Sequence, residues 1–410
     1  MTLVVETASG VYLRTILPAA LLPEGIPVGD AAEDATKDAA ARWGLPDFVF
    51  NSAQSTRGSA RREVGDAIVV VGSVGASVQV KARQIDAGDE TRERSWLDKK
   101  IEQASRQAAG TIKSLKSNRQ TVLVNQRGRQ VAIDGSEKSW LPVVVLHHRG
   151  VAGYIPASSA VVLLRRDWEF LFQQLKSTYA VLEYLMRVKD MEPIPLGEEP
   201  VRYYQLAAAD AVTPPNPIDP RLAELPYESR SGPLLPQTPA GNDNLRDHSF
   251  LRAVMEDIAN VEAGPQGIQP SDVLAVLAAI DAAPITQRSE MGRTMVNWLR
   301  ELSKLPPSGG VTWRFRNHFW PERPYLLFGA ANKLVQEGFN AFLVLRHQQQ
   351  LDLMPERAGM LTVGVLLTPR RDGLRPWDTT AAATRGHQQI EKGDRTELEA
   401  LWGKLGQSMP

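Results

Sequence analysis

The sequence predicts an α/β protein with two domains joined by a proline-rich segment. Three observations lead to this prediction. The first 150 residues show the order helix, strand, strand, strand, helix, strand, because apolar residues recur at helical spacing in some stretches and alternate in others. Proline becomes dense between 191 and 244. The region 245–410 again shows both helical and strand patterns, and 410 residues exceed one ordinary domain.

The composition limits the class of protein. A content of 43% hydrophobic and 23% charged residues is typical of a globular chain. No apolar run is long enough for a membrane span, and the first residues lack the pattern of a signal peptide, so a cytoplasmic protein is expected. The absence of Cys excludes disulfides, thiolate nucleophiles and zinc–cysteine sites. The net charge is zero, yet basic residues are twice as frequent as acidic ones between 81 and 130.

The first elements precede the most informative part of the chain. Residues 1–29 are expected to be irregular, with one short strand at 11–13. A helix is predicted over 30–43, because Asp30 can cap its start, Glu33 lies in its first turn and Pro46 follows its end. Residues 47–50 are predicted to form a strand.

The stretch 62–83 predicts two strands joined by a tight turn, because Val and Ile flank a central Gly-Ser-Val-Gly. If Ser73 and Val74 form the turn, Asp66 lies opposite Lys81, and Ile68 lies opposite Gln79. Side chains alternate between the two faces of a strand. One face would then be apolar and buried, consisting of Ala67, Val69, Val71, Ala76, Val78 and Val80. The other face would gather a carboxylate, an amide and an ammonium group at one end.

This hairpin resembles the motif of the PD-(D/E)xK superfamily of restriction-endonuclease-like nucleases, in which an Asp on one strand precedes an acid-x-Lys sequence on the next. Asp66 matches the first Asp, and Gln79-Val80-Lys81 matches the second part. Gln79 replaces the usual acid, a form familiar from the Mrr-type branch, and removes one negative charge from the expected metal site. The resemblance covers the first third of the chain.

The resemblance implies an αβββαβ restriction-endonuclease-like core within a nuclease domain at 1–190. It also implies a Mg²⁺- or Mn²⁺-dependent endonuclease that hydrolyses DNA, with a role in bacterial restriction or antiviral defence. Asp66, Gln79 and the backbone carbonyl of Val80 would hold the metal, while Lys81 would neutralise phosphate charge or orient the attacking water. Glu33 on the first helix matches the position of the additional acid found in many members.

A long helix is predicted over 91–117, because apolar residues recur every three or four positions. Polar side chains on its remaining surface are candidate contacts to nucleic acid, namely Lys99, Lys100, Gln103 and Arg106. A solvated helix surface is the alternative explanation of these residues, and the simpler one for Gln103. Further strands are expected at 121–125, 130–133, 141–146 and 160–164, followed by an apolar helix at 167–187.

The remaining chain identifies no ligand. Residues 191–244 are predicted to be a linker or a wrapping segment, and 245–410 a mixed α/β domain for recognition, partner binding or oligomerisation. Helices are expected at 246–261, 271–282, 286–303, 326–348 and 393–405, and strands at 311–316 and 361–367. The polar stretch 368–380 is either a binding loop or an ordered surface loop. The six His are expected to be structural or surface residues.

Two other functions remain open from the sequence. A chain that lacks the second carboxylate fits a non-catalytic binding or scaffold protein with a nuclease-like fold. An RNA-directed nuclease would use the same residues on a different substrate. A metal titration distinguishes the scaffold protein from a metal-dependent nuclease. Competition between DNA and RNA substrates distinguishes the RNA nuclease from the DNA nuclease.

Overall fold

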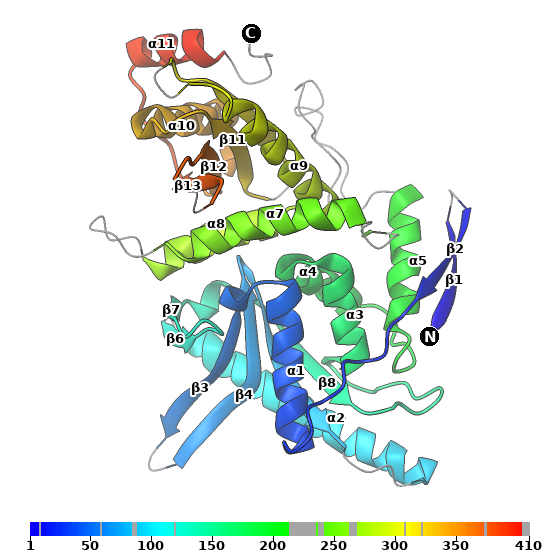
Figure 1. The fold of residues 1–410 in the computed structure, drawn as a ribbon. Helices are drawn as coiled ribbons and strands as arrows, with labels where there is room; N and C mark the ends of the chain where they lie inside the picture. The colour runs from blue at the N-terminus through cyan, green and yellow to red at the C-terminus, as the bar shows by residue number, and fades with distance from the viewer. Residues whose placement is uncertain are drawn as a thin grey trace. The chain divides into compact units, whose positions relative to one another are not determined.

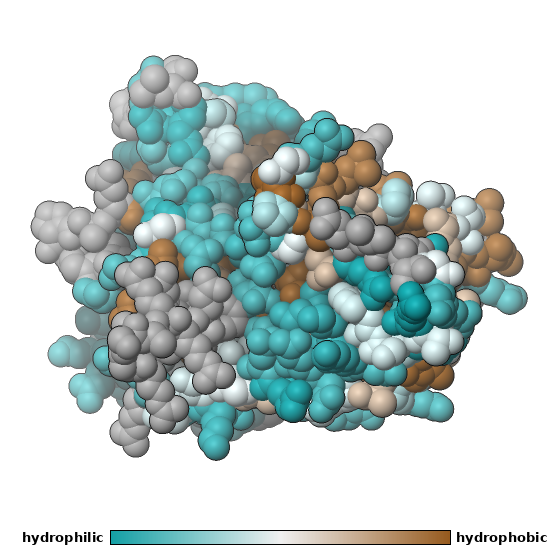
Figure 2. All heavy atoms as spheres, turned by 90° about the horizontal axis from the view of Figure 1, so that it is seen from below, coloured by the Kyte–Doolittle hydropathy of each residue, from teal (hydrophilic) through white to brown (hydrophobic). Residues whose placement is uncertain are grey.

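The computed structural model describes residues 1–7, 10–57, 60–83, 88–118, 120–212, 235–236, 242–261, 269–306, 309–320, 323–372 and 375–403. The predicted α/β class is confirmed, because sheets and helices alternate along the chain (Figure 1). Two compact units are present, one of Met1–Val212, Leu235–Pro239 and Ile268–Ala275, the other of Thr213–Leu234, Ala240–Gly267 and Val276–Pro410. None of the helices described is long and apolar enough for a membrane span. The face drawn in Figure 2 is mostly hydrophilic.

A five-stranded sheet with the strand order β3-β4-β5-β8-β9 organises the first unit. Its strands are β3 (Val49–Arg57), β4 (Ala60–Val71), β5 (Val74–Ala82), β8 (Ser139–His147) and β9 (Val161–Leu164). The first three are antiparallel, and β8 and β9 run parallel to β5. The parallel strands are almost wholly buried, which explains their continuous Val and Leu runs.

Helices α1 (Val28–Trp43) and α2 (Glu90–Ser117) cover opposite faces of this sheet (Figure 1). The buried side of α1 consists mainly of Ala, so this helix can approach the sheet closely. The side chain of Asp89 accepts a hydrogen bond from the Thr91 N–H and caps α2. Beyond this cap, Leu97, Ile101 and Ala104 pack in one cluster with Val144 and Leu146 of β8.

The hairpin exists, but its predicted register is wrong by two residues. Val71 pairs with Val74, so Gly72 and Ser73 form the turn, and Gly72 adopts a left-handed φ of 57°. Ile68 therefore lies opposite Ser77 and not opposite Gln79. Because a shift of two preserves the alternation, the predicted sets of side chains still share a face.

The other face of the hairpin is buried as well, which the sequence pattern did not indicate. Ile68 and Val70 are 0% and 2% exposed and pack in a cluster with Leu115 of α2. Val69, on the other face, is 1% exposed. The sheet is therefore the middle layer between helices.

Additional elements complete the first unit: β1 (Thr2–Thr7), β2 (Gly10–Thr15), β6 (Thr121–Val124), β7 (Gln130–Ile133), α3 (Arg165–Leu175), α4 (Thr178–Lys189) and α5 (Glu199–Val212). The ribbon β1–β2 lies where the sequence predicted one short strand. The helix predicted at 167–187 is two helices, because Lys176 adopts a φ of 47° and Ser177 caps α4. Helix α5 falls inside the segment expected to be a linker.

The second unit contains a four-stranded sheet with the order β10-β11-β12-β13. Its elements are α7 (Asn242–Ala259), α9 (Ile285–Leu302), β10 (Trp313–His318), β11 (Tyr325–Ala331), α10 (Gln336–Leu353), β12 (Thr362–Pro369), β13 (Trp377–Thr384) and α11 (Lys392–Trp402), while α8 (Pro270–Asp281) includes residues of both units. The helix predicted at 326–348 is wrong in its first part, which forms β11. This strand pairs parallel to β12 and is buried on both faces.

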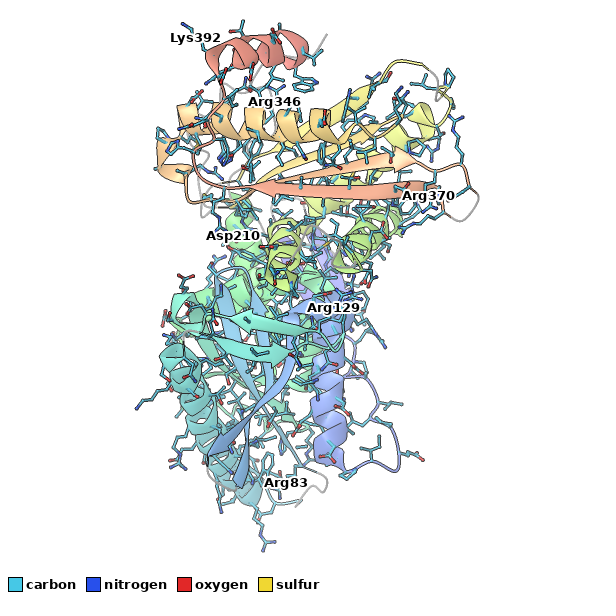
Figure 3. All side chains as sticks on the ribbon, turned by 90° about the vertical axis from the view of Figure 1, so that its left-hand side faces the viewer. Arg83, Arg129, Asp210, Arg346, Arg370 and Lys392 are labelled. Carbon is cyan, nitrogen blue, oxygen red and sulfur yellow. The ribbon has the colours of Figure 1, made fainter. Side chains whose placement is uncertain are left out.

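The polar stretch 368–380 is held by contacts inside the second unit. The carboxylate of Asp257 accepts hydrogen bonds from Trp377 Nε1 and Thr379 Oγ1 and pairs with Arg375. Arg370, at the end of β12 in Figure 3, pairs with Asp372 and Asp378. The prediction of a loop over all of 368–380 is wrong at both ends, because Thr368 and Pro369 of β12 pair with Asp378 and Trp377 of β13.

A pair of glycine substitutions tests the packing around α2. Gly135→Ala is expected to lower stability by about 1–3 kcal/mol, because the new Cβ would lie 2.2 Å from the Leu115 carbonyl oxygen. Gly110→Ala is expected to raise stability by about 0.5–1 kcal/mol, because it removes a glycine from an open helix position. Melting temperatures should therefore shift in opposite directions, and equal shifts would contradict the packing described.

Candidate active site

Asp66 and Lys81 meet at the open end of the β4–β5 hairpin. The Lys81 ammonium lies 3.6 Å from Asp66 Oδ2, and the two side chains are 18% and 19% exposed. The same oxygen accepts a hydrogen bond of 2.6 Å from the Val80 backbone N–H. The carboxylate is thus held by one hydrogen bond and one ion pair while part of it remains accessible.

A β-bulge at Gly65 and Asp66 places the carboxylate here. Asn51 pairs with Ala67 and Ala53 with Val64, so two residues of β4 lie opposite Ser52 alone. Counted from the turn, the last pair of the hairpin ladder is Ala67 with Val78, so the ladder stops one residue short of Asp66. Because the backbone pairing stops at this point, the Asp66 side chain can turn toward Val80 and take the place of a ladder partner.

Glu33 of α1 belongs to the same electrostatic cluster. Burial and, after it, the negative charge of Asp66 raise the pKa of its carboxyl to about 7, against the opposing charges of Lys37 and Lys81. The helix thus brings a second carboxylate toward the end of the hairpin. Because the negative charge of Asp66 disfavours the ionised form of Glu33, a cation bound near the two carboxyl groups would be stabilised.

Lys37 is a member of this cluster that the sequence reasoning missed. Its ammonium pairs with Asp34 at 2.9 Å, its side chain is 17% exposed, and its charge lowers the pKa of Glu33. The spacing of Lys37 from Glu33 could have indicated this position, because residues four apart lie on the same side of a helix.

Gln79 is more deeply placed than the sequence suggested. The residue is 2% exposed, and among the described residues its Nε2 finds no hydrogen-bond partner. The Val80 N–H points toward β4, and in an extended strand the carbonyl of the same residue points to the same side. Val80 therefore offers a backbone oxygen beside Asp66.

The candidate nucleic-acid contacts lie along α2. Lys99 and Arg106 are exposed, and Lys100 and Gln103 are half-buried. Arg106 pairs with Glu102 at 3.7 Å. The contacts described bring none of the four to Asp66 or Lys81, so their role in binding nucleic acid stays a prediction.

A second charged network at the ends of β5 and β8 was not foreseen. Glu93 of α2 is buried and pairs with Arg83 at 3.1 Å and with His148 Nε2 at 2.7 Å. The neighbouring His147 accepts from Arg165 Nε of α3 at 3.2 Å, on the other side of the sheet. These two histidines thus point to opposite faces of the sheet, as predicted.

The oxygen atoms at the hairpin end suit a hard cation. Within the part of the chain described, no three His, Asp or Glu side chains converge as a metal site. Mg²⁺, however, commonly uses one or two carboxylates together with water and substrate phosphate. Glu33, Asp66 and the Val80 carbonyl supply such a set, so the residues present fit a magnesium ion.

Comparisons with known proteins identify no relative. No family model, no curated protein and no solved structure matches this chain.

The raised pKa of Glu33 predicts a pH dependence of stability. An acid whose pKa is higher in the folded state takes up a proton when the protein folds. The free energy of unfolding that it contributes therefore falls as the pH rises from about 5 through 7. Glu33→Gln removes this titration. The variant is expected to be more stable than the wild type at pH 8 and to lose that advantage at pH 5, in thermal melts without added metal. A constant difference across this range would contradict the assignment.

Proposed function

We propose that this chain is a Mg²⁺-dependent endonuclease that hydrolyses DNA, with a nuclease core of the restriction-endonuclease-like type. The observation that supports it best is the ion pair of Asp66 and Lys81 at one partly open end of the sheet, whose charges also act on the pKa of Glu33. The order α1, β3, β4, β5, α2, β8 also agrees with that core. Restriction or antiviral defence is implied by the resemblance of the motif.

In this proposal, Asp66, Glu33 and the Val80 carbonyl hold the metal, with Gln79 next to them. A bound Mg²⁺ would polarise the scissile phosphate and lower the pKa of an attacking water. Lys81 neutralises the charge that develops on the phosphate, because its ammonium is already held beside the carboxylate. Lys37 adds positive charge on the α1 side of the site.

Incubation with supercoiled plasmid and either Mg²⁺ or Mn²⁺ tests the proposal. Nicked or linear DNA that appears only with the metal would support it. No cleavage with either ion would reject it. Addition of excess RNA as a competitor distinguishes a DNA nuclease from an RNA nuclease.

A binding protein without catalytic activity is the second candidate, because Gln79 replaces a carboxylate and its side chain is buried. The melting temperature separates the two functions. A metal-dependent enzyme should be stabilised by millimolar Mg²⁺ or Mn²⁺, whereas a scaffold without the ion site should show no such shift.

A further inference from the structure

Arg83 provides a second cation beyond Lys81 at the same end of the sheet. The Arg83 backbone N–H donates to the His147 carbonyl at 3.1 Å, so the pairing with β8 continues to this residue. Residues two apart in an extended strand project from the same face, about 6.6 Å apart along the chain. Lys81 and Arg83 thus form a row of two positive charges.

Buried groups fix the position of the Arg83 guanidinium. Arg83 Nη2 lies 3.1 Å from Glu93 Oε1, and the guanidinium carbon lies 5.3 Å from the centre of the Trp96 ring. The other oxygen of Glu93 contacts His148, whose ring stacks on Trp96 at 5.4 Å. The Glu93 side chain is 2% exposed but that of Arg83 is 19% exposed, so the cation reaches solvent while its anchor does not. Figure 3 shows Arg83 beside α2.

The contacts of Arg83 with Glu93 and Trp96 are expected to orient the guanidinium more than they stabilise the fold. A buried ion pair contributes little net stability, because desolvation offsets the attraction. A guanidinium held between a carboxylate and an indole, however, loses little further freedom when it binds a ligand. Planar guanidinium groups bind phosphate oxygens through two parallel hydrogen bonds.

We propose that Arg83 binds the nucleic-acid phosphate next to the one contacted by Lys81, and that Glu93 is a positioning residue for Arg83. This inference rests on the proposed function, because it takes the substrate to be a nucleic acid. It extends the site by one phosphate along the strand and explains why a buried acid lies in the first turn of α2.

Equilibrium binding of a short labelled DNA duplex, measured in EDTA at several salt concentrations, tests the role of Arg83. Arg83→Gln is expected to weaken binding several-fold and to reduce the slope of log affinity against log salt by about 0.9, the value for one lost phosphate contact. Arg83→Lys should restore the slope. Lys116→Gln is the matched control, because it makes the same charge change. Lys116 lies about 35 Å along α2 from Glu93, the partner of Arg83, so the slope should stay unaltered.

Glu93→Gln tests the positioning role separately. Arg83 keeps its charge in this variant, so the salt slope should equal that of the wild type while the affinity falls. An unchanged affinity would reject the role of Glu93, and a slope unaltered by Arg83→Gln would reject the role of Arg83. Wild-type protein that binds no duplex would also overturn the inference.

The plasmid assay distinguishes failure of this inference from failure of the proposed function. Metal-dependent cleavage together with an unaltered slope in Arg83→Gln rejects the phosphate contact alone. A reduced slope in a protein that never cleaves rejects the nuclease function and leaves the contact established. A purely structural role would lower the melting temperature of Arg83→Gln without changing the slope.

Discussion

Asp66→Asn is expected to lower Mg²⁺-dependent DNA cleavage by about 10³-fold, which corresponds to about 4 kcal/mol of transition-state stabilisation. The substitution keeps the shape of the side chain, and its amide oxygen can still accept the Val80 N–H. It removes the charge that pairs with Lys81 and that a bound metal would need. The measurement is the initial rate of plasmid nicking at saturating Mg²⁺.

Asp38→Asn is the matched control, because Asp38 is an exposed acid on α1 and the charge change is the same. This variant should cleave at the wild-type rate. Equal rates for Asp66→Asn and Asp38→Asn would remove Asp66 from the site, provided that both variants melt as the wild type does.

The placement of Asp66 and Lys81 together at one end of the hairpin could be predicted from the sequence, because side chains alternate along a strand with a period of two. The predicted turn was wrong, since Gly72 and not Ser73 occupies its first central position. The predicted register was shifted by two residues, an even number, so each side chain was still assigned to the correct face of the sheet. A register shift of one residue would have placed Asp66 and Lys81 on opposite sides.

The features that complete the site depend on tertiary structure. The bulge at Gly65 and Asp66 arises from the pairing of β4 with β3, and no residue type demands it at that point. Glu93 and His148 are far apart in the chain, so no local pattern connects them. Burial by α2 of the second sheet face likewise depends on how the layers assemble.

The misassigned strand β11 has a different cause. Its seven residues are all buried, because the strand is covered on both faces and pairs parallel to β12. Such a strand shows a continuous apolar run without alternation, which a buried helix also shows. The run continues almost directly into α10, so the pattern alone merged the two elements.

Trp168→Ala is expected to destabilise the first unit by about 3–5 kcal/mol, which would lower its melting temperature by about 6–20 °C. Trp168 of α3 is 0% exposed, and its ring lies 4.9 Å from that of Phe172. The indole N–H donates to the Thr36 carbonyl of α1 at 3.0 Å. Truncation therefore leaves a cavity and releases a contact to the helix that carries Glu33.

Trp168→Phe separates the two effects, because it keeps most of the apolar area and loses only the hydrogen bond to Thr36. We expect a smaller loss of stability than for Trp168→Ala, with a reduced cleavage rate at temperatures where the protein is folded. The rate should fall because α1 holds Glu33 and Lys37 one turn apart on either side of Thr36. Full activity in Trp168→Phe would show that Trp168 supports the fold without positioning α1.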